Sequence, residues 1–112
     1  MLPKKYRLKK EKDFELVFKR GRKANSDSLF LKFKKNNLFF SRFGFSVGKK
    51  ISKKAVIRNK IKRKLSNIIY KEIKNIKSGF DVIIIVTSKI LDKNYQEIKM
   101  ELNKLLNKAN LL

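Results

Sequence analysis

Asp81-Val82-Ile83-Ile84-Ile85-Val86 is the stretch that decides the fold, with one acid followed by five consecutive β-branched residues. A continuous run of this kind is typical of a strand that is covered on both of its faces. We therefore expect it to lie in the middle of a sheet. The run is far too short to span a bilayer, so no membrane partner is expected.

Two alternating segments upstream are predicted to be further strands. In residues 29–33, Leu29, Leu31 and Phe33 would share one face, with Phe30 and Lys32 on the other. Residues 42–48 alternate in the same way, and the two segments most simply form an antiparallel hairpin. Residues 23–28 are predicted to hold a very short edge strand. One face is large and apolar, while small residues leave room for a ligand on the other, namely Gly44, Ser46 and Gly48.

Helical patterns occupy most of the remaining chain. Residues 9–20 have helical spacing, and Gly21 stands where a left-handed C-terminal cap would fall. A long helix is predicted over residues 54–74, and Asn94 with Glu97 resembles the capping box of a last helix. We expect a single domain over residues 1–112, with residues 1–8 as a flexible basic N-terminus. The fold class is α+β, a two-layer sandwich in the order helix-strand-strand-strand-helix-strand-helix.

The composition indicates what kind of partner the chain binds and excludes several kinds of chemistry. The chain has 31 Lys plus Arg against 9 Asp plus Glu, a net charge of +22 that needs a polyanion to neutralise it. Hydrophobic residues make up 42% of the chain, too many for a disordered basic tail. Cys and His are absent, which excludes disulfides, thiolate or imidazole metal sites and histidine acid/base chemistry. The N-terminus leads into charge, so we expect no secretory signal and a cytoplasmic protein.

The acids do not resemble the centre of a protein nuclease. Most of them stand beside lysine at helical spacing. Glu97 and Glu101 are one helical turn apart and could share a divalent ion, but a solvated helix face is the better interpretation. We expect no catalytic residue, no metal ligand and no tightly bound cofactor in this chain. Binding is the role that remains.

The segment Arg58-Asn59-Lys60-Ile61-Lys62-Arg63, called here the basic segment, opens the hydrophobic pattern of the long helix. At about 100° per residue, Ile57, Ile61, Leu65, Ile68 and Ile69 form one stripe, while Asn59, Arg63, Ser66 and Tyr70 project from the opposite side. An ordinary solvated lysine-rich face is the alternative. However, like charges at this density destabilise a free helix, which favours an external anion. Guanidinium groups suit phosphate, and Asn59 can bond to sugar or base edges.

A second candidate surface is aromatic. Phe14 and Phe18 of the first helix and Phe30 of the sheet could stack unpaired bases while Lys32 follows the backbone. Burial in the core is the better interpretation for each phenylalanine taken alone. The opposite face of the sheet already has enough apolar residues for a core, however, so Phe30 is not needed there and is available for binding.

Taken together, these features resemble the protein subunit of bacterial ribonuclease P, over nearly the whole chain. The basic segment resembles the family signature Arg-Asn-Arg-x-Lys-Arg, and Lys49-Lys50 precede it at the expected distance. The other matching features are Asp13-Phe14 with Val17-Phe18 and Gly21, Arg42-Phe43-Gly44-Phe45-Ser46-Val47, Ala55 and the Asp81 strand.

The resemblance implies a small mixed sheet in which the basic helix crosses between parallel strands with a left-handed sense. It also implies a catalytic RNA subunit that holds Mg²⁺ and removes the 5′ leader of precursor tRNA. It does not imply a protein partner. Its implied RNA-subunit surface is Arg58, Asn59, Lys60, Lys62 and Arg63 with Lys49 and Lys50. Its implied leader cleft, called here the aromatic surface, is Phe14, Phe18, Phe30, Lys32 and Ser46.

The sequence also departs from the family pattern. Lys60 replaces a usual arginine, Ser66 stands where a basic residue is common, and Lys32 stands where an aromatic is common. The loop Ser52-Lys53-Lys54 lacks a frequent glycine. The alternative function is a ribosomal or other structural rRNA-binding protein, which would not need an open aromatic cleft. A free-standing nuclease is disfavoured by the acids.

Overall fold

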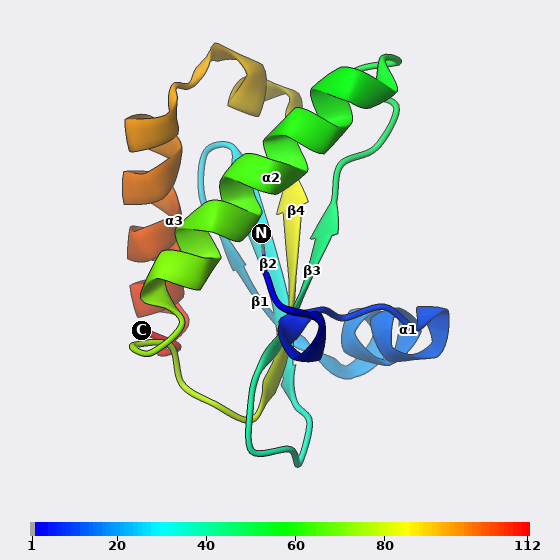
Figure 1. The fold of residues 1–112 in the computed structure, drawn as a ribbon, viewed down its shortest axis with the longest axis vertical. Coiled ribbons are helices and arrows are strands. Elements are labelled where there is room, and N and C mark those ends of the chain that lie inside the picture. Colours follow the sequence, from blue (N-terminus) through cyan, green and yellow to red (C-terminus); the bar gives the residue numbers. More distant parts are fainter. Residues whose placement is uncertain (1) are drawn as a thin grey trace.

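The computed structural model describes residues 2–112 of the chain (Figure 1). Its α+β class, its small mixed sheet and its order of helices and strands confirm the predicted fold class. Two short 3₁₀ helices, η1 (Lys4–Tyr6) and η2 (Ser88–Asp92), were not predicted. The other elements are α1 (Glu11–Arg20), β1 (Arg22–Asn25), β2 (Leu29–Lys35), β3 (Arg42–Ser46), α2 (Ala55–Glu72), β4 (Phe80–Val86) and α3 (Tyr95–Lys108).

The sheet has the strand order β1-β2-β4-β3, with the β-branched run of β4 in an interior position as predicted. The expected hairpin between β2 and β3 is wrong, because β4 lies between these strands. It pairs antiparallel with β2 and parallel with β3. Alternation fixes which face a side chain takes but not which strand is its neighbour. The strand with two apolar faces takes the interior position because only there are both faces covered. The chain crosses from β3 to β4 through α2.

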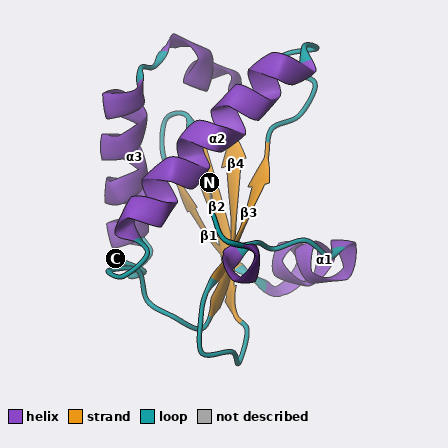
Figure 2. Ribbon diagram, viewed as in Figure 1, coloured by secondary structure: helices purple, strands orange, loops and turns teal. Residues whose placement is uncertain are grey.

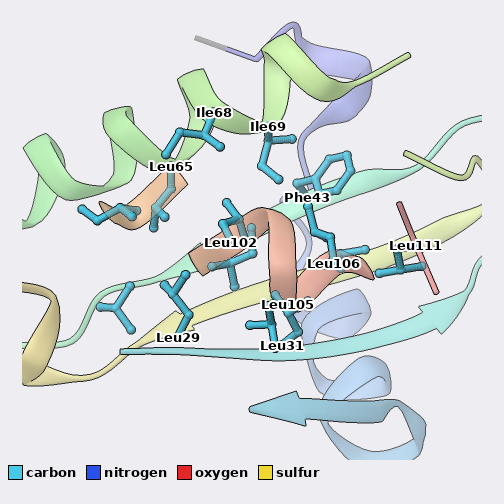
Figure 3. Packing of buried hydrophobic residues seen from close by; sticks show 14 of the residues in the cluster. Leu29, Leu31, Phe43, Leu65, Ile68, Ile69, Leu102, Leu105, Leu106 and Leu111 are labelled. Atoms are coloured by element: carbon cyan, nitrogen blue, oxygen red, sulfur yellow. The ribbon is translucent and has the colours of Figure 1, made fainter. Parts of the chain in front are cut away.

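The main core lies between one face of the sheet and helices α2 and α3 (Figure 3). Leu29 and Leu31 of β2 meet Leu65 of α2 and Leu102 of α3, and all four side chains are fully buried. The predicted capping box of α3 is confirmed. The Asn94 side chain accepts a hydrogen bond from the Glu97 backbone N–H, and the Glu97 side chain accepts one from the Asn94 backbone N–H. The sequence therefore identified the N-cap residue of this helix.

Helix α1 packs on the other face of the sheet and covers part of it (Figure 2). Val17 of α1 and Leu8 are buried against Ile83 of β4, with Phe14 and Ile85 packed around them. This second cluster is much smaller than the main core. Part of the sheet face beside α1 is therefore left for other contacts.

Two local predictions differ from the structure. Residues 2–8, expected to be flexible, pack on the fold: Leu2 and Leu8 are buried, and the Leu8 N–H donates to the Phe43 carbonyl at 2.9 Å. Met1 lies outside the described residues. Gly21 does not form a left-handed cap, since its φ is −77°. Glycine is needed at this position because other backbone atoms approach it closely. A Cβ atom there would meet the Val17 carbonyl oxygen and would stand 3.0 Å from the Phe33 carbonyl oxygen.

Candidate nucleic-acid interface

The basic segment lies in the first half of α2, and its side chains leave the helix in different directions. Asn59, Lys60 and Arg63 are exposed, whereas Arg58 and Lys62 are half-buried along one edge of the packed side. The Arg58 guanidinium donates to the Ser52 carbonyl at 2.9 Å. Arg58 therefore also fixes the loop that leads into the helix.

The predicted division of α2 into two sides is mostly correct. Ile61, Leu65, Ile68 and Ile69 are buried, and Asn59, Arg63 and Tyr70 face outward. Ser66 is the exception, because it is buried with a relative exposure of 9%. It falls at the border of the apolar stripe, where the N-terminal segment and β3 approach the helix. A helical wheel cannot place such a border residue, because its burial depends on which neighbours flank the stripe.

The loop before α2 concentrates further positive charge at the helix start. Lys49, Lys50, Lys53 and Lys54 are all exposed. Lys54 is the N-cap residue and makes no side-chain capping bond, and the first turn contains no acid. The partial positive charge of a helix N-terminus is therefore not balanced from within the chain. This end of α2 favours an anion from outside.

The aromatic surface begins with two rows of residues across the sheet, on the face that carries α1. Phe30 of β2 and Ser46 of β3 both pair with Ile85 of β4, so the three form one row. In the next row, Lys32 and Gly44 flank Ile83 in the same way. Phe30, Lys32 and Ser46 are half-buried and so remain accessible from outside.

Helix α1 contributes the other two side chains. The ring of Phe14 lies over Gly44, where a Cβ atom would stand 2.7 Å from Phe14 Cε1. Phe18 is 42% exposed, and its carbonyl accepts a hydrogen bond from Lys32 Nζ at 3.1 Å. All five predicted residues thus belong to one side of the sheet, and α1 stands beside the row Phe30–Ile85–Ser46.

Two separate hollows flank this surface, and neither contains all five residues. Phe14 lines a hollow of about 370 Å³ at the β3 edge, together with Lys62 and Ser66 of α2. Ser46 lines another of about 420 Å³ with Lys50. Arg7 and Lys9, which the sequence did not single out, also line the first hollow. Their position depends on the packed N-terminal segment, so no local motif could have identified them.

A partly buried ion-pair network links α1 to the sheet. The carboxylate of Asp81, which is 6% exposed, accepts two bonds from the Arg42 guanidinium at 2.8 and 2.7 Å. Arg42 also lies 3.4 Å from Asp13 of α1. The hydrogen bond to Asp81 raises the pKa of Arg42 against the opposing effect of burial. Asp13 and Asp81 therefore hold structural positions.

Several other acids are engaged in the same manner. Glu101 and Asp27 both bind Lys93, and Glu97 completes the capping box of α3. Within residues 2–112, no group of three or more Asp or Glu side chains is placed to hold a metal ion. In the same part of the chain, no helix is both long and apolar enough to cross a membrane.

The fold and its surfaces define a small, strongly basic α+β domain with an accessible aromatic sheet face. The Ribonuclease P family model matches residues 2–110, and the chain belongs to this family. The ribonuclease P protein component of Synechocystis sp. is 37% identical over 99% of this chain and 90% of its own length. The ribonuclease P protein component of Alkaliphilus oremlandii is 34% identical over 95% of this chain and 92% of its own length.

Solved structures show the same fold. A Staphylococcus aureus RNase P protein mutant with defective mRNA degradation activity superposes with a TM-score of 0.91 at 30% identity, covering 97% of this chain and 92% of that one. The RNase P protein from Thermotoga maritima in complex with 1-(4-fluorophenyl)-2-thiourea superposes with a TM-score of 0.84 at 33% identity. The match covers 89% of this chain and 96% of that one. Ribonuclease P is an endoribonuclease of tRNA processing, and its protein component works with an RNA partner in a ribonucleoprotein. The family match decides against the alternative of a ribosomal protein.

Proposed function

We propose that this chain binds the catalytic RNA subunit of ribonuclease P through the basic segment, Lys49 and Lys50, and binds the 5′ leader of precursor tRNA on the aromatic surface. The observation that carries the proposal is the position of α1. It leaves the row Phe30–Ile85–Ser46 beside exposed Phe18, while α2 turns Asn59 and Arg63 outward elsewhere on the fold. Two RNA segments can therefore be bound at once.

The catalytic groups and Mg²⁺ belong to the RNA partner in this proposal. The sequence has no His or Cys to act as acid, base or nucleophile. Asp13, Asp27, Asp81 and Glu101 form ion pairs within the fold, and Glu97 accepts a capping bond of α3, so these carboxylates hold structural positions. The protein then acts by aligning the substrate and by screening the repulsion between two RNA chains.

The RNA-subunit surface is tested by replacing Arg58, Lys62 and Arg63 together with Gln. We expect the affinity for the catalytic RNA to fall by at least about tenfold near 150 mM salt, because three ion-pairing groups are lost. Filter binding with labelled RNA measures the effect. A control replaces Lys99, Lys104 and Lys108 of α3 with Gln, which removes the same charge elsewhere. Equal affinities for the two triple variants would contradict the assignment.

The leader surface is tested by Phe18→Ala, since Phe18 is 42% exposed and contributes little to the core. Loss of one stacked base predicts about 5- to 100-fold weaker binding of substrate that carries a leader. Substrate without a leader should bind as before. Leu16→Ala is the matched control, because Leu16 is 44% exposed on the opposite side of the same helix. The same loss with both substrates would show that Phe18 does not contact the leader.

A further inference from the structure

The loop between β2 and β3 presents an aromatic ring that no role described above explains. Phe39 is 99% exposed, and its neighbour Leu38 is 39% exposed. One exposed apolar residue is common on protein surfaces and needs no explanation by itself. Phe39 differs from such a residue in two respects, namely the hydrogen bonds that hold its loop and the side chains that surround its ring.

The loop is fixed by a set of hydrogen bonds that begins at Asn36. The Asn36 backbone N–H donates to the Gly79 carbonyl at 2.9 Å, and its side-chain oxygen accepts from the Leu38 N–H at 2.8 Å. Its side-chain nitrogen donates to the buried Asp81 carboxylate at 2.9 Å and to the Phe40 carbonyl at 3.2 Å. These bonds fix the backbone on both sides of Phe39. A preorganised loop of this kind lowers the entropic cost of binding a ligand to the ring.

A hollow of about 250 Å³ lies beside the ring and combines aromatic walls with positive charge. The Tyr6 and Phe40 rings meet edge to face with centroids 6.4 Å apart. Lys5 Nζ stands 4.9 Å from the Tyr6 centroid. The charged residues lining the hollow are Lys5 and Lys74, both cations. Rings flanked by lysine are the elements that bind unpaired nucleotides.

The position of this hollow indicates which RNA would occupy it. The loop follows Lys35, which pairs with Phe80 at the start of β4, whereas Phe30 of the aromatic surface pairs with Ile85 near its end. The two surfaces are therefore at opposite ends of the sheet (Figure 1). Lys74 continues the exposed ridge of α2, which carries Asn59, Arg63, Asn67 and Tyr70. A polymer lying along that ridge reaches the hollow, whereas a leader at the other end of the sheet does not.

We propose that Phe39, with the hollow formed by Lys5, Tyr6, Phe40 and Lys74, is a second stacking site that binds an unpaired base of the catalytic RNA subunit. This inference rests on the proposed function in one respect, that α2 faces this RNA. It adds a contact at the far end of the helix from the basic segment. The phenyl ring stacks on the base while the two lysines contact neighbouring phosphates.

Three substitutions at one position test the stacking. Phe39→Ala should weaken binding of the RNA subunit by about 5- to 100-fold, because alanine offers no surface for the base. Phe39→Leu should weaken it similarly, since leucine is apolar but has no ring face. Phe39→Trp should bind within about threefold of the original protein, because the stacking surface is kept. All three should keep the original urea midpoint, since the side chain is 99% exposed.

Leu38→Ala, in the same loop, is the matched control and should bind RNA as the original protein does. The proposal is overturned if the Phe39→Ala protein binds the RNA subunit as tightly as the original protein does. It is also overturned if the Phe39→Leu protein does so, because that result indicates an apolar contact without stacking. A loss confined to leader-bearing substrate also overturns it. Failure of the proposed function is separately visible, because the Arg58, Lys62 and Arg63 triple variant would then keep its affinity.

A photo-crosslinking amino acid at position 39 identifies the partner directly. In the assembled complex of protein, RNA subunit and substrate, we expect the crosslink to fall on an unpaired nucleotide of the RNA subunit. A crosslink to the precursor tRNA, to a paired nucleotide or to another copy of the protein would contradict the proposal.

Discussion

The ring of Phe14 lies directly on the backbone of Gly44, and this contact sets the height of α1 above the sheet. A Cβ atom at Gly44 would stand 2.7 Å from Phe14 Cε1 and 3.4 Å from Leu8 Cβ. Real Cβ atoms do not approach ring carbons so closely, so any side chain here must displace the ring. Gly44 therefore controls the position of one wall of the aromatic surface.

Gly44→Ala is expected to move the Phe14 ring and to weaken binding of leader-bearing substrate by about fivefold or more, the loss associated with one stacked base. Overpacking should also lower the free energy of unfolding by about 1–2 kcal/mol. Urea denaturation and leader-dependent binding measure the two effects. Gly48→Ala is the control for overpacking and should keep the original free energy of unfolding, because the nearest atom to a Cβ at Gly48 is 4.0 Å away. Unaltered leader affinity in the Gly44→Ala protein would show that Phe14 is not part of the leader surface.

Gly44 and Ser66 show which side-chain positions could be predicted from local periodicity and which could not. Alternation correctly placed Gly44 on the face opposite the main core, because period two is a local property of a strand. The space expected above it is filled by the Phe14 ring. The same local reasoning failed for Ser66, which is buried by the N-terminal segment and β3. Burial at the border of a helix depends on chain segments distant in sequence.

At the scale of elements, Glu101 joins α3 to the turn between β1 and β2. Its carboxylate accepts from the Ser28 backbone N–H at 2.7 Å, from the Ser28 hydroxyl at 2.6 Å and from the Ser26 hydroxyl. Lys93 Nζ lies 2.7 Å from the same group. Burial acts to raise the pKa of Glu101, but the bonds from Lys93, Ser26 and Ser28 outweigh it and lower the pKa to about 2.

This lowered pKa predicts acid sensitivity. The unfolded chain holds Glu101 near its ordinary pKa of 4.5, so its stabilising contribution is complete above that pH and is lost as the pH falls toward about 2. The contribution is at most about 3 kcal/mol. Urea denaturation between pH 6 and pH 3 should show a smaller loss of stability for Glu101→Gln than for the original protein. Glu15→Gln, at an exposed residue of α1, should keep the original slope. Equal slopes for Glu101→Gln and the original protein would refute this role.

Elements were predictable where their signals are local. The capping box at Asn94 and the faces of β2 needed only neighbouring residues. The pairing of β2 with β3 was wrong, because closeness in sequence was taken as closeness in the sheet. The β-branched run of β4 indicated an interior strand whose two faces are both covered, as Ile83 is by α1 and Ile84 by the main core, but it did not indicate that β2 and β3 are its two neighbours. The contacts of Glu101 with Ser28 and Ser26 could not be predicted, since they join residues 73 and 75 positions apart.

At the scale of the whole molecule, the excess of positive charge is not neutralised within the fold. The chain has 31 cations and 9 acids, and Arg42, Lys89 and Lys93 take up the carboxylates of Asp13, Asp27, Asp81 and Glu101. Most lysines and arginines therefore remain available to an external polyanion. Association with RNA releases the counterions condensed on its phosphates, and this release makes binding depend on salt.

The salt dependence of RNA-subunit binding is the last prediction. With about 6 to 10 phosphate contacts, the affinity should fall by roughly 10³ to 10⁵ between 50 and 200 mM monovalent salt at constant Mg²⁺. Replacing Arg58, Lys62 and Arg63 with Gln should reduce the slope of log affinity against log salt by about three, because each lost phosphate contact removes about one from the slope. The Phe39→Ala protein should keep the original slope while binding more weakly at every salt concentration, since stacking releases no counterions. A slope unchanged by the triple substitution would mean that phosphates are contacted elsewhere. A slope reduced by Phe39→Ala would mean that the site acts through Lys5 and Lys74 of the hollow rather than through the ring.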